Sequence, residues 1–194
     1  VRSTDNVGNV SSVASSDGVT IDVTDPAISS VVEGSATGDV DYQNVVDELI
    51  ISWSGTDTAS GITSYEYALG TTSGGTDAID WTSAGTSTSV TLTSLNLTEE
   101  TTYYLSTRAT DVAGNISDVS TGDGITIDLT APAGTTVSDG TGDDITYTGS
   151  DSSLSAVWPA FTETVSGIAK YEYAIGSTSG GTDIVDWTDN STHT

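Results

Sequence analysis

Tyr65 to Thr82 reads YEYALGTTSGGTDAIDWT, and 106 residues later Tyr171 to Thr188 reads YEYAIGSTSGGTDIVDWT. Fourteen of the 18 positions are identical. The first part of each segment alternates aromatic or aliphatic residues with others, which is the period of a β-strand with one buried face. The adjacent glycines that follow permit positive φ angles and indicate a turn. The chain therefore holds at least two copies of one β-rich unit.

A second pair of segments repeats at the same offset. Residues 2–26 read RSTDNVGNVSSVASSDGVTIDVTDP, and residues 108–132 read RATDVAGNISDVSTGDGITIDLTAP. The proline that ends each segment fixes φ and lacks an N–H, so it suits the junction before a first strand. We therefore expect 1–24 to be the C-terminal strands of a preceding repeat, 25–130 a complete repeat, and 131–194 the N-terminal part of a following repeat.

Period-two patterns predict the strands of the complete repeat. They lie around Leu49–Trp53, Ile62–Leu69, Val90–Leu92, Tyr103–Ala109 and Ile116–Asp128. Turn residues separate them, and no segment of useful length carries a helical period. About seven short strands in roughly 100 residues are typical of an immunoglobulin-like sandwich. We expect two β-layers over one apolar interior that contains Trp53, Tyr65, Tyr67, Tyr103 and Leu105.

These residues resemble the fibronectin type III family. Trp53 matches the family's early-strand tryptophan, Ile62–Tyr67 matches the pattern of its next strand, and the strongest match is Leu97–Tyr103. The resemblance implies an all-β, fibronectin type III-like β-sandwich in tandem repeats of 106 residues, with Tyr103 as the tyrosine corner. The phrases ATDxAGN and DGxTIDxTxP are similar to repeats of large bacterial surface proteins, which implies adhesion at the cell surface.

The charge of the chain restricts its partners. Asp and Glu number 28 against three Lys and Arg, which gives a formal net charge of −25. Such a surface repels phosphate and anionic lipid, so we expect no nucleic-acid partner and no direct membrane insertion. There is no cysteine, so no disulfide or thiolate metal site can form. Salt or bound divalent cations are the obvious means of relieving the self-repulsion.

Catalytic signals are weak, and we expect no enzyme activity. The single histidine, His193, stands one residue from the end of the chain, where a general base is not held in place. The adjacent acids Glu99 and Glu100 invite comparison with a glycosidase pair. Their position in a short loop before Tyr103 favours solvated turn residues instead.

Calcium is the candidate ligand, because it takes six to eight hard oxygen ligands. Several aspartates fall at the repeat junctions or in loops that the sandwich topology brings towards them. The candidate ligands are Asp22, Asp25, Asp39, Asp41, Asp111 and Asp128. The alternative, solvated acids suited to a salty medium, stays open at this point. No EF-hand loop is present.

Trp81 and Trp187 follow the glycine loop in both copies and are candidates for stacking on a sugar ring. The competing interpretation is that they cover a sheet edge or the rim of the core.

Two functions remain in view. The first is a non-catalytic structural or adhesion repeat of an exported bacterial surface protein, an extended spacer with calcium-stiffened junctions. The alternative is a carbohydrate-binding or spacer module of a secreted polysaccharide-degrading enzyme. Both imply an extracellular or cell-surface location. The partners are neighbouring repeats of the same chain, together with a surface glycan or protein that other regions of the parent would bind.

Overall fold

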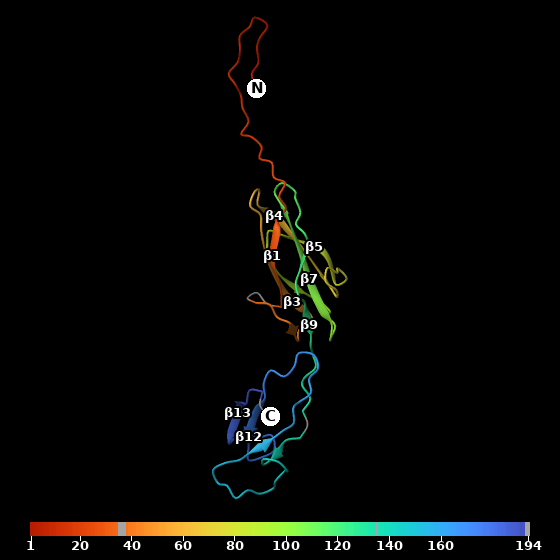
Figure 1. The fold of residues 1–194 in the computed structure, drawn as a ribbon, viewed down its shortest axis with the longest axis vertical. Helices are drawn as coiled ribbons and strands as arrows, with labels where there is room; N and C mark the ends of the chain where they lie inside the picture. The colour runs from red at the N-terminus through yellow and green to blue at the C-terminus, as the bar shows by residue number, and fades with distance from the viewer. Residues whose placement is uncertain (35–37, 135, 193–194) are drawn as a thin grey trace.

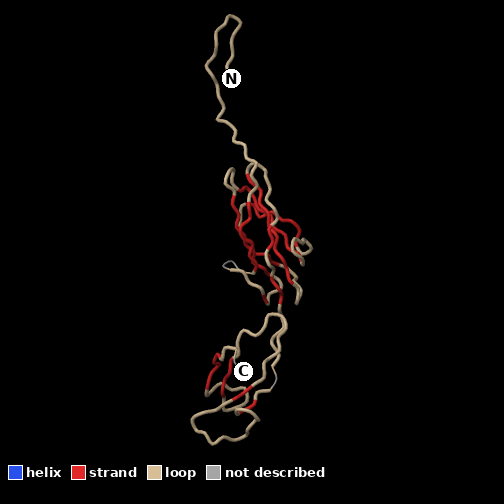
Figure 2. Tube along the Cα trace, in the orientation of Figure 1, coloured by secondary structure: helices blue, strands red, loops and turns tan. Residues whose placement is uncertain are grey.

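The computed structural model describes residues 1–34, 38–134 and 136–192, and this part of the chain is all β (Figure 2). It contains no helix, and therefore none with the length and hydropathy of a membrane span. A β-sandwich occupies the middle of the chain, with the N-terminal segment beyond one end and the C-terminal segment beyond the other (Figure 1). The fold is the immunoglobulin-like sandwich that the strand pattern predicts.

The sandwich has a three-stranded and a six-stranded layer. The first has the order β1-β3-β6, and the second has the order β2-β9-β7-β4-β5, with β8 also paired to β7. This arrangement is that of a fibronectin type III-like sandwich. The strands of the first layer are β1 (Ala27–Glu33), β3 (Glu48–Thr56) and β6 (Ser89–Thr93). Those of the second are β2 (Tyr42–Gln43), β4 (Ile62–Gly70), β5 (Ile79–Gly85), β7 (Thr102–Asp111), β8 (Ser120–Thr121) and β9 (Ile125–Ile127).

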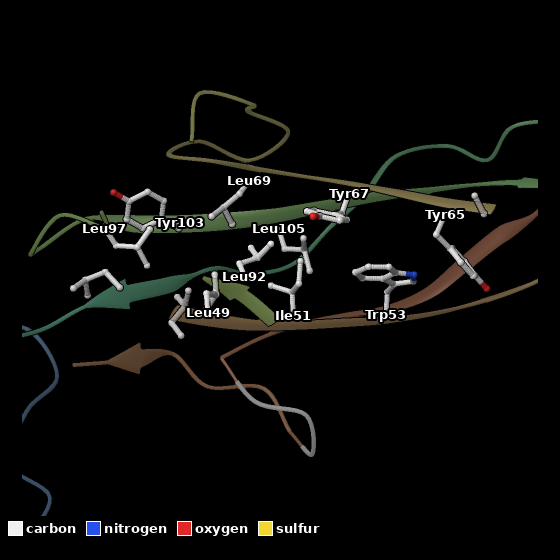
Figure 3. Packing of buried hydrophobic residues seen from close by; sticks show 13 residues of the cluster. Leu49, Ile51, Trp53, Tyr65, Tyr67, Leu69, Leu92, Leu97, Tyr103 and Leu105 are labelled. Atoms are coloured by element: carbon white, nitrogen blue, oxygen red, sulfur yellow. The ribbon is translucent and has the colours of Figure 1, made fainter. Parts of the chain in front are cut away.

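The core lies between the layers, where alternate residues of β3, β4 and β7 face inward (Figure 3). All five side chains expected in the interior are buried. Trp53 packs against Tyr65 and Tyr67, with ring centroids 6.0 and 5.9 Å apart. Such aromatic pairs contribute about 0.5–1.5 kcal/mol each beyond the area they bury. Tyr103 forms the predicted corner, because its hydroxyl accepts a hydrogen bond from the backbone N–H of Thr98 at 3.0 Å.

The last predicted strand differs from the observed structure. Residues 116–128 form two short strands, β8 and β9, rather than one. The chain between them carries Gly122 and Gly124, and Gly124 has a φ of +98°. A strand cannot continue regularly through a positive φ, so the pairing with β7 is interrupted. At this interruption the backbone N–H of Leu105 donates its hydrogen bond to the side chain of Glu33.

The flanking segments are less regular. Residues 1–24 contain no strand, and their β pairing is limited to an isolated bridge between Thr4 and Val10. In the C-terminal segment, Tyr171 is buried, but Leu154 is exposed. Its described residues form two two-stranded sheets. Its strands are β10 (Ser138–Asp139), β11 (Ala156–Val157), β12 (Glu172–Ile175) and β13 (Val185–Asp189). The domain boundaries stay a prediction.

Candidate functional site

The phrase Asp-x-x-Gly-Asn folds into a turn organised by its aspartate. The Oδ1 atom of Asp111 accepts hydrogen bonds from the backbone N–H groups of Gly114 and Asn115, at 2.7 and 2.8 Å. The Asn115 side-chain amide donates to the other oxygen, Oδ2, at 2.7 Å. Burial opposes ionisation of Asp111, but the hydrogen bonds from Asn115 and Gly114 outweigh it and hold its pKa below the ordinary value. The buried Asp111 is therefore kept as a carboxylate.

The same turn forms in the preceding copy without a sandwich around it. There Asp5 accepts from the backbone N–H of Asn9 at 2.8 Å, and the Asn9 side chain donates to its second oxygen at 2.8 Å. These hydrogen bonds also lower the pKa of Asp5. The turn is thus a local product of its sequence, and the sandwich only positions it.

Asn115 also reaches the segment that enters the sandwich. Its side-chain amide lies 3.4 Å from the carbonyl oxygen of Asp22 and 3.3 Å from that of Thr24. Both contacts are long, so each contributes little alone. Together they tie the chain before β1 to the turn after β7.

Asp57 completes a group of three acids at this end. In the loop after β3, its Oδ2 atom accepts from the backbone N–H of Ser60 at 2.9 Å and of Gly61 at 2.6 Å. Asp22, Asp57 and Asp111 each offer a carboxylate oxygen within 4.8 Å of the others. We call these three residues the junction cluster. Oδ2 of Asp22 and Oδ1 of Asp57 are both buried and have no hydrogen-bond partner among the described residues.

The junction cluster gathers negative charge and only oxygen ligands. In the described part of the chain, ion pairs join Arg108 to Glu66 and Lys170 to Glu172, so no basic side chain pairs with the cluster. Carboxylate oxygens without a counter-charge suit a hard cation such as calcium, which accepts an irregular set of oxygens completed by water.

The next junction repeats part of this arrangement. Asp128 and Glu163 stand 106 positions after Asp22 and Asp57. The hydroxyl of Ser166, in the Glu163 loop, donates to Oδ2 of Asp128 at 2.5 Å. The counterpart of Asp111 would be position 217, beyond this chain.

The remaining calcium candidates lie elsewhere. Asp39 belongs to a second group of acids with Glu33 and Asp123, and it raises the pKa of Asp123 through a side-chain hydrogen bond and its charge, with a smaller contribution from the charge of Asp41. Asp25 and Asp128 lie outside both groups, and Asp25 is exposed. The pattern therefore placed Asp22 and Asp111 at one site but missed Asp57, Glu33 and Asp123.

The two tryptophans of the glycine loop have different surroundings. Trp81 lies on the edge strand β5, and the Arg108 guanidinium sits over its ring, 4.4 Å from the centroid. Arg108 is fixed in turn by Glu66, at 2.8 Å. One face of Trp81 is therefore already covered, whereas Trp187 is 65% exposed. Glycan stacking by either residue stays a prediction.

The residues considered as weak catalytic candidates are Glu99, Glu100 and His193. The side chain of Glu99 accepts a hydrogen bond from the Thr130 hydroxyl, and Glu100 occupies a turn with a φ of +57°. His193 lies outside the described residues.

Comparison with known proteins gives one informative similarity. No known family profile matches the chain. Over 199 aligned residues the chain is 30% identical to exoglucanase B of Cellulomonas fimi. The match covers 97% of this chain but only 17% of exoglucanase B, so the similarity concerns a small part of that protein.

Proposed function

We propose that this chain is a non-catalytic spacer from an extracellular bacterial protein, and that calcium at the junction cluster holds consecutive repeats in line. The observation that carries the proposal is the meeting of Asp22, from the segment before the sandwich, with Asp57 from the loop after β3 and Asp111 from the end of β7. A cation bound by all three would link the preceding chain to the sandwich. Without one, like charges would push the two apart.

The direction of the strands supports the spacer role. The strands run along the length of the molecule, and the chain enters the sandwich at one end and leaves at the other (Figure 1). Repeats joined in this way add length rather than bulk. Stiffness then depends on the junctions, because the short connections between repeats carry few apolar contacts of their own.

We propose a polysaccharide-degrading enzyme as the parent, because the whole chain aligns to part of a protein named as an exoglucanase. A spacer there would separate a catalytic domain from another module. A surface adhesin is the second candidate, and tandem repetition at 106 residues with a net charge of −25 favours it. The parent sequence distinguishes them: a catalytic domain beside a few repeats supports the enzyme, and dozens of repeats support the adhesin.

Thermal unfolding of the 194-residue chain tests the calcium junction. We expect calcium to raise the melting temperature of the wild type, and EGTA to reverse the rise. A cation at 100 times its Kd adds about 2.7 kcal/mol to the unfolding free energy. Asp57→Asn keeps one oxygen to cap its loop but removes a charged ligand, so its rise in melting temperature with calcium should be smaller than that of the wild type. The control, Asp118→Asn, changes an exposed acid outside the cluster. Equal responses from the two variants would contradict the proposal.

The non-catalytic role has its own test. We expect that the chain does not hydrolyse insoluble cellulose and does not sediment with it. If the chain sedimented with cellulose and Trp81→Ala or Trp187→Ala abolished this sedimentation, the chain would be a carbohydrate-binding module and not a spacer.

A further inference from the structure

A buried glutamate closes a gap in the second sheet. Glu33, the last residue of β1, is fully buried. Its Oε1 atom accepts a hydrogen bond from the backbone N–H of Leu105 at 3.0 Å, where the pairing of β7 passes from β8 to β9. Gly122 makes room for the carboxylate, since a Cβ there would lie 2.2 Å from its oxygens. The second oxygen, Oε2, is buried and has no hydrogen-bond partner among the described residues.

Two further acids face this carboxylate. Oδ1 of Asp39 accepts a hydrogen bond from the backbone N–H of Glu33 at 3.0 Å, which ties Asp39 to the end of β1. Asp123 lies in the glycine-containing segment between β8 and β9. Glu33, Asp39 and Asp123 each offer a carboxylate oxygen within 4.8 Å of the others. We call these three residues the inner cluster.

Within the described part of the chain, no positively charged side chain pairs with the inner cluster. The ion pairs of the described residues engage Arg108 and Lys170 elsewhere. Burial raises the pKa of Glu33 to about 7; the Leu105 N–H opposes that rise, and the charges of Asp39 and Asp123 add to it. A side-chain hydrogen bond and the charge of Asp39 raise the pKa of Asp123 as well. The folded chain thus holds three acids together at a cost that a proton or a bound cation would relieve.

Acids recur at the repeat offset for two of these three positions, whereas the counterpart of Asp39 is Ile145. Asp17 stands 106 positions before Asp123, and Asp139 stands 106 positions after Glu33. In the following copy, Oδ1 of Asp144 accepts the backbone N–H of Asp139 at 2.9 Å, as Asp39 does for Glu33. The contact therefore forms again at Asp139, which is exposed, so it does not depend on burial in the sandwich.

We propose that Glu33, Asp39 and Asp123 form a second calcium site within the sandwich, separate from the junction. The buried, unpaired oxygen of Glu33 supplies the inner ligand, and the exposed Asp39 and Asp123 leave room for water to complete the coordination. Calcium fits better than magnesium, which demands a regular octahedron and keeps most of its water.

The site would link the two layers of the sandwich. Glu33 belongs to the three-stranded layer, whereas Asp123 joins two strands of the six-stranded layer. A cation between them would tie the end of β1 to the interrupted edge of β7. It would act as a cross-link in a chain that has no cysteine for a disulfide.

Isothermal titration of the metal-free 194-residue chain with calcium chloride at pH 7.5 tests the inference. We expect Asp123→Asn to bind one calcium ion fewer than the wild type. This residue is exposed, so the variant should fold, which circular dichroism would verify. Glu33→Gln, which keeps an oxygen for the Leu105 N–H, should lose the same ion. The matched control, Asp47→Asn, changes an exposed acid outside both clusters and should bind as the wild type does.

The outcome is independent of the junction. Asp57→Asn should remove the junction ion and leave the inner one. Retention of the wild-type stoichiometry by both Asp123→Asn and Glu33→Gln would overturn the inner site, even if the Asp57 variant lost an ion. Loss of an ion in those two variants alone would support the inner site and reject the junction. A wild type that binds no calcium would reject both.

Discussion

Replacing Tyr103 with phenylalanine removes one hydroxyl group and tests the corner that closes the sandwich. The Tyr103 ring is 5% exposed, and phenylalanine fills the same space. The loss is therefore the hydrogen bond from the Thr98 N–H, at 3.0 Å. A buried unpaired donor costs about 1–3 kcal/mol, but Thr98 is exposed and water can reach its backbone in part. We expect a loss of about 1 kcal/mol, or a fall in Tm of about 4–8 °C for a domain of this size.

Urea unfolding at 25 °C, followed by tryptophan emission, measures this loss. The matched control is Tyr104→Phe, because Tyr104 is the next residue and half-buried, and its hydroxyl makes no hydrogen bond with the described residues. We expect the control to lie within about 0.5 kcal/mol of the wild type. If both variants lost the same stability, the corner hydrogen bond would contribute nothing and the reasoning would be refuted.

Two further predictions concern the glycine loop. A Cβ on Gly70 would lie 2.4 Å from the backbone of Gly75, so Gly70→Ala should destabilise the chain by about 1–3 kcal/mol in urea unfolding. The control, Gly38→Ala, places its Cβ in open space and should leave the stability unchanged. Hydrogen bonds from the backbone and hydroxyl of Thr71 lower the pKa of Asp77, so the stability that they add is present above pH 3.8 and is lost as the pH falls through the folded-state pKa. The variant Thr71→Val should move the pKa of Asp77 back towards 3.8 in a carbon-detected NMR titration. An unchanged pKa would contradict this cause.

The core could be predicted because it follows from period and parity. Tyr103 and Leu105 stand on one face of their strand, and Trp53 on one face of another, so the burial of these three side chains follows from alternation alone. The strands β1 and β5 carried no such signal. In β1, AISSVVE places its only fully buried residue, Glu33, at a polar position, and only the pairing with β3 reveals the strand.

The site could be predicted in part for the same kind of reason. Asp22 and Asp111 lie in phrases that recur at one offset, so the sequence connected them to the junction. Asp57 lies in a loop that the topology brings towards the junction, but no local sequence pattern indicates that its Oδ1 atom is buried without a hydrogen-bond partner. Glu33 could not be found from local pattern, because its partner Leu105 lies 72 residues away and its cavity depends on a glycine in a third segment. The available signal was that an acid precedes a glycine in both copies, at Glu33 and at Asp139.

The most direct test of the calcium junction is a distance measurement across it. The chain has no cysteine, so nitroxide labels on Thr20→Cys and Ser87→Cys report only the position of the entering segment relative to the sandwich. Pulsed electron spin resonance should give a narrow distance distribution in calcium and a broad one in EGTA, and the added change Asp57→Asn should make it broad in both. A distribution that calcium leaves unchanged would contradict the cation-held junction.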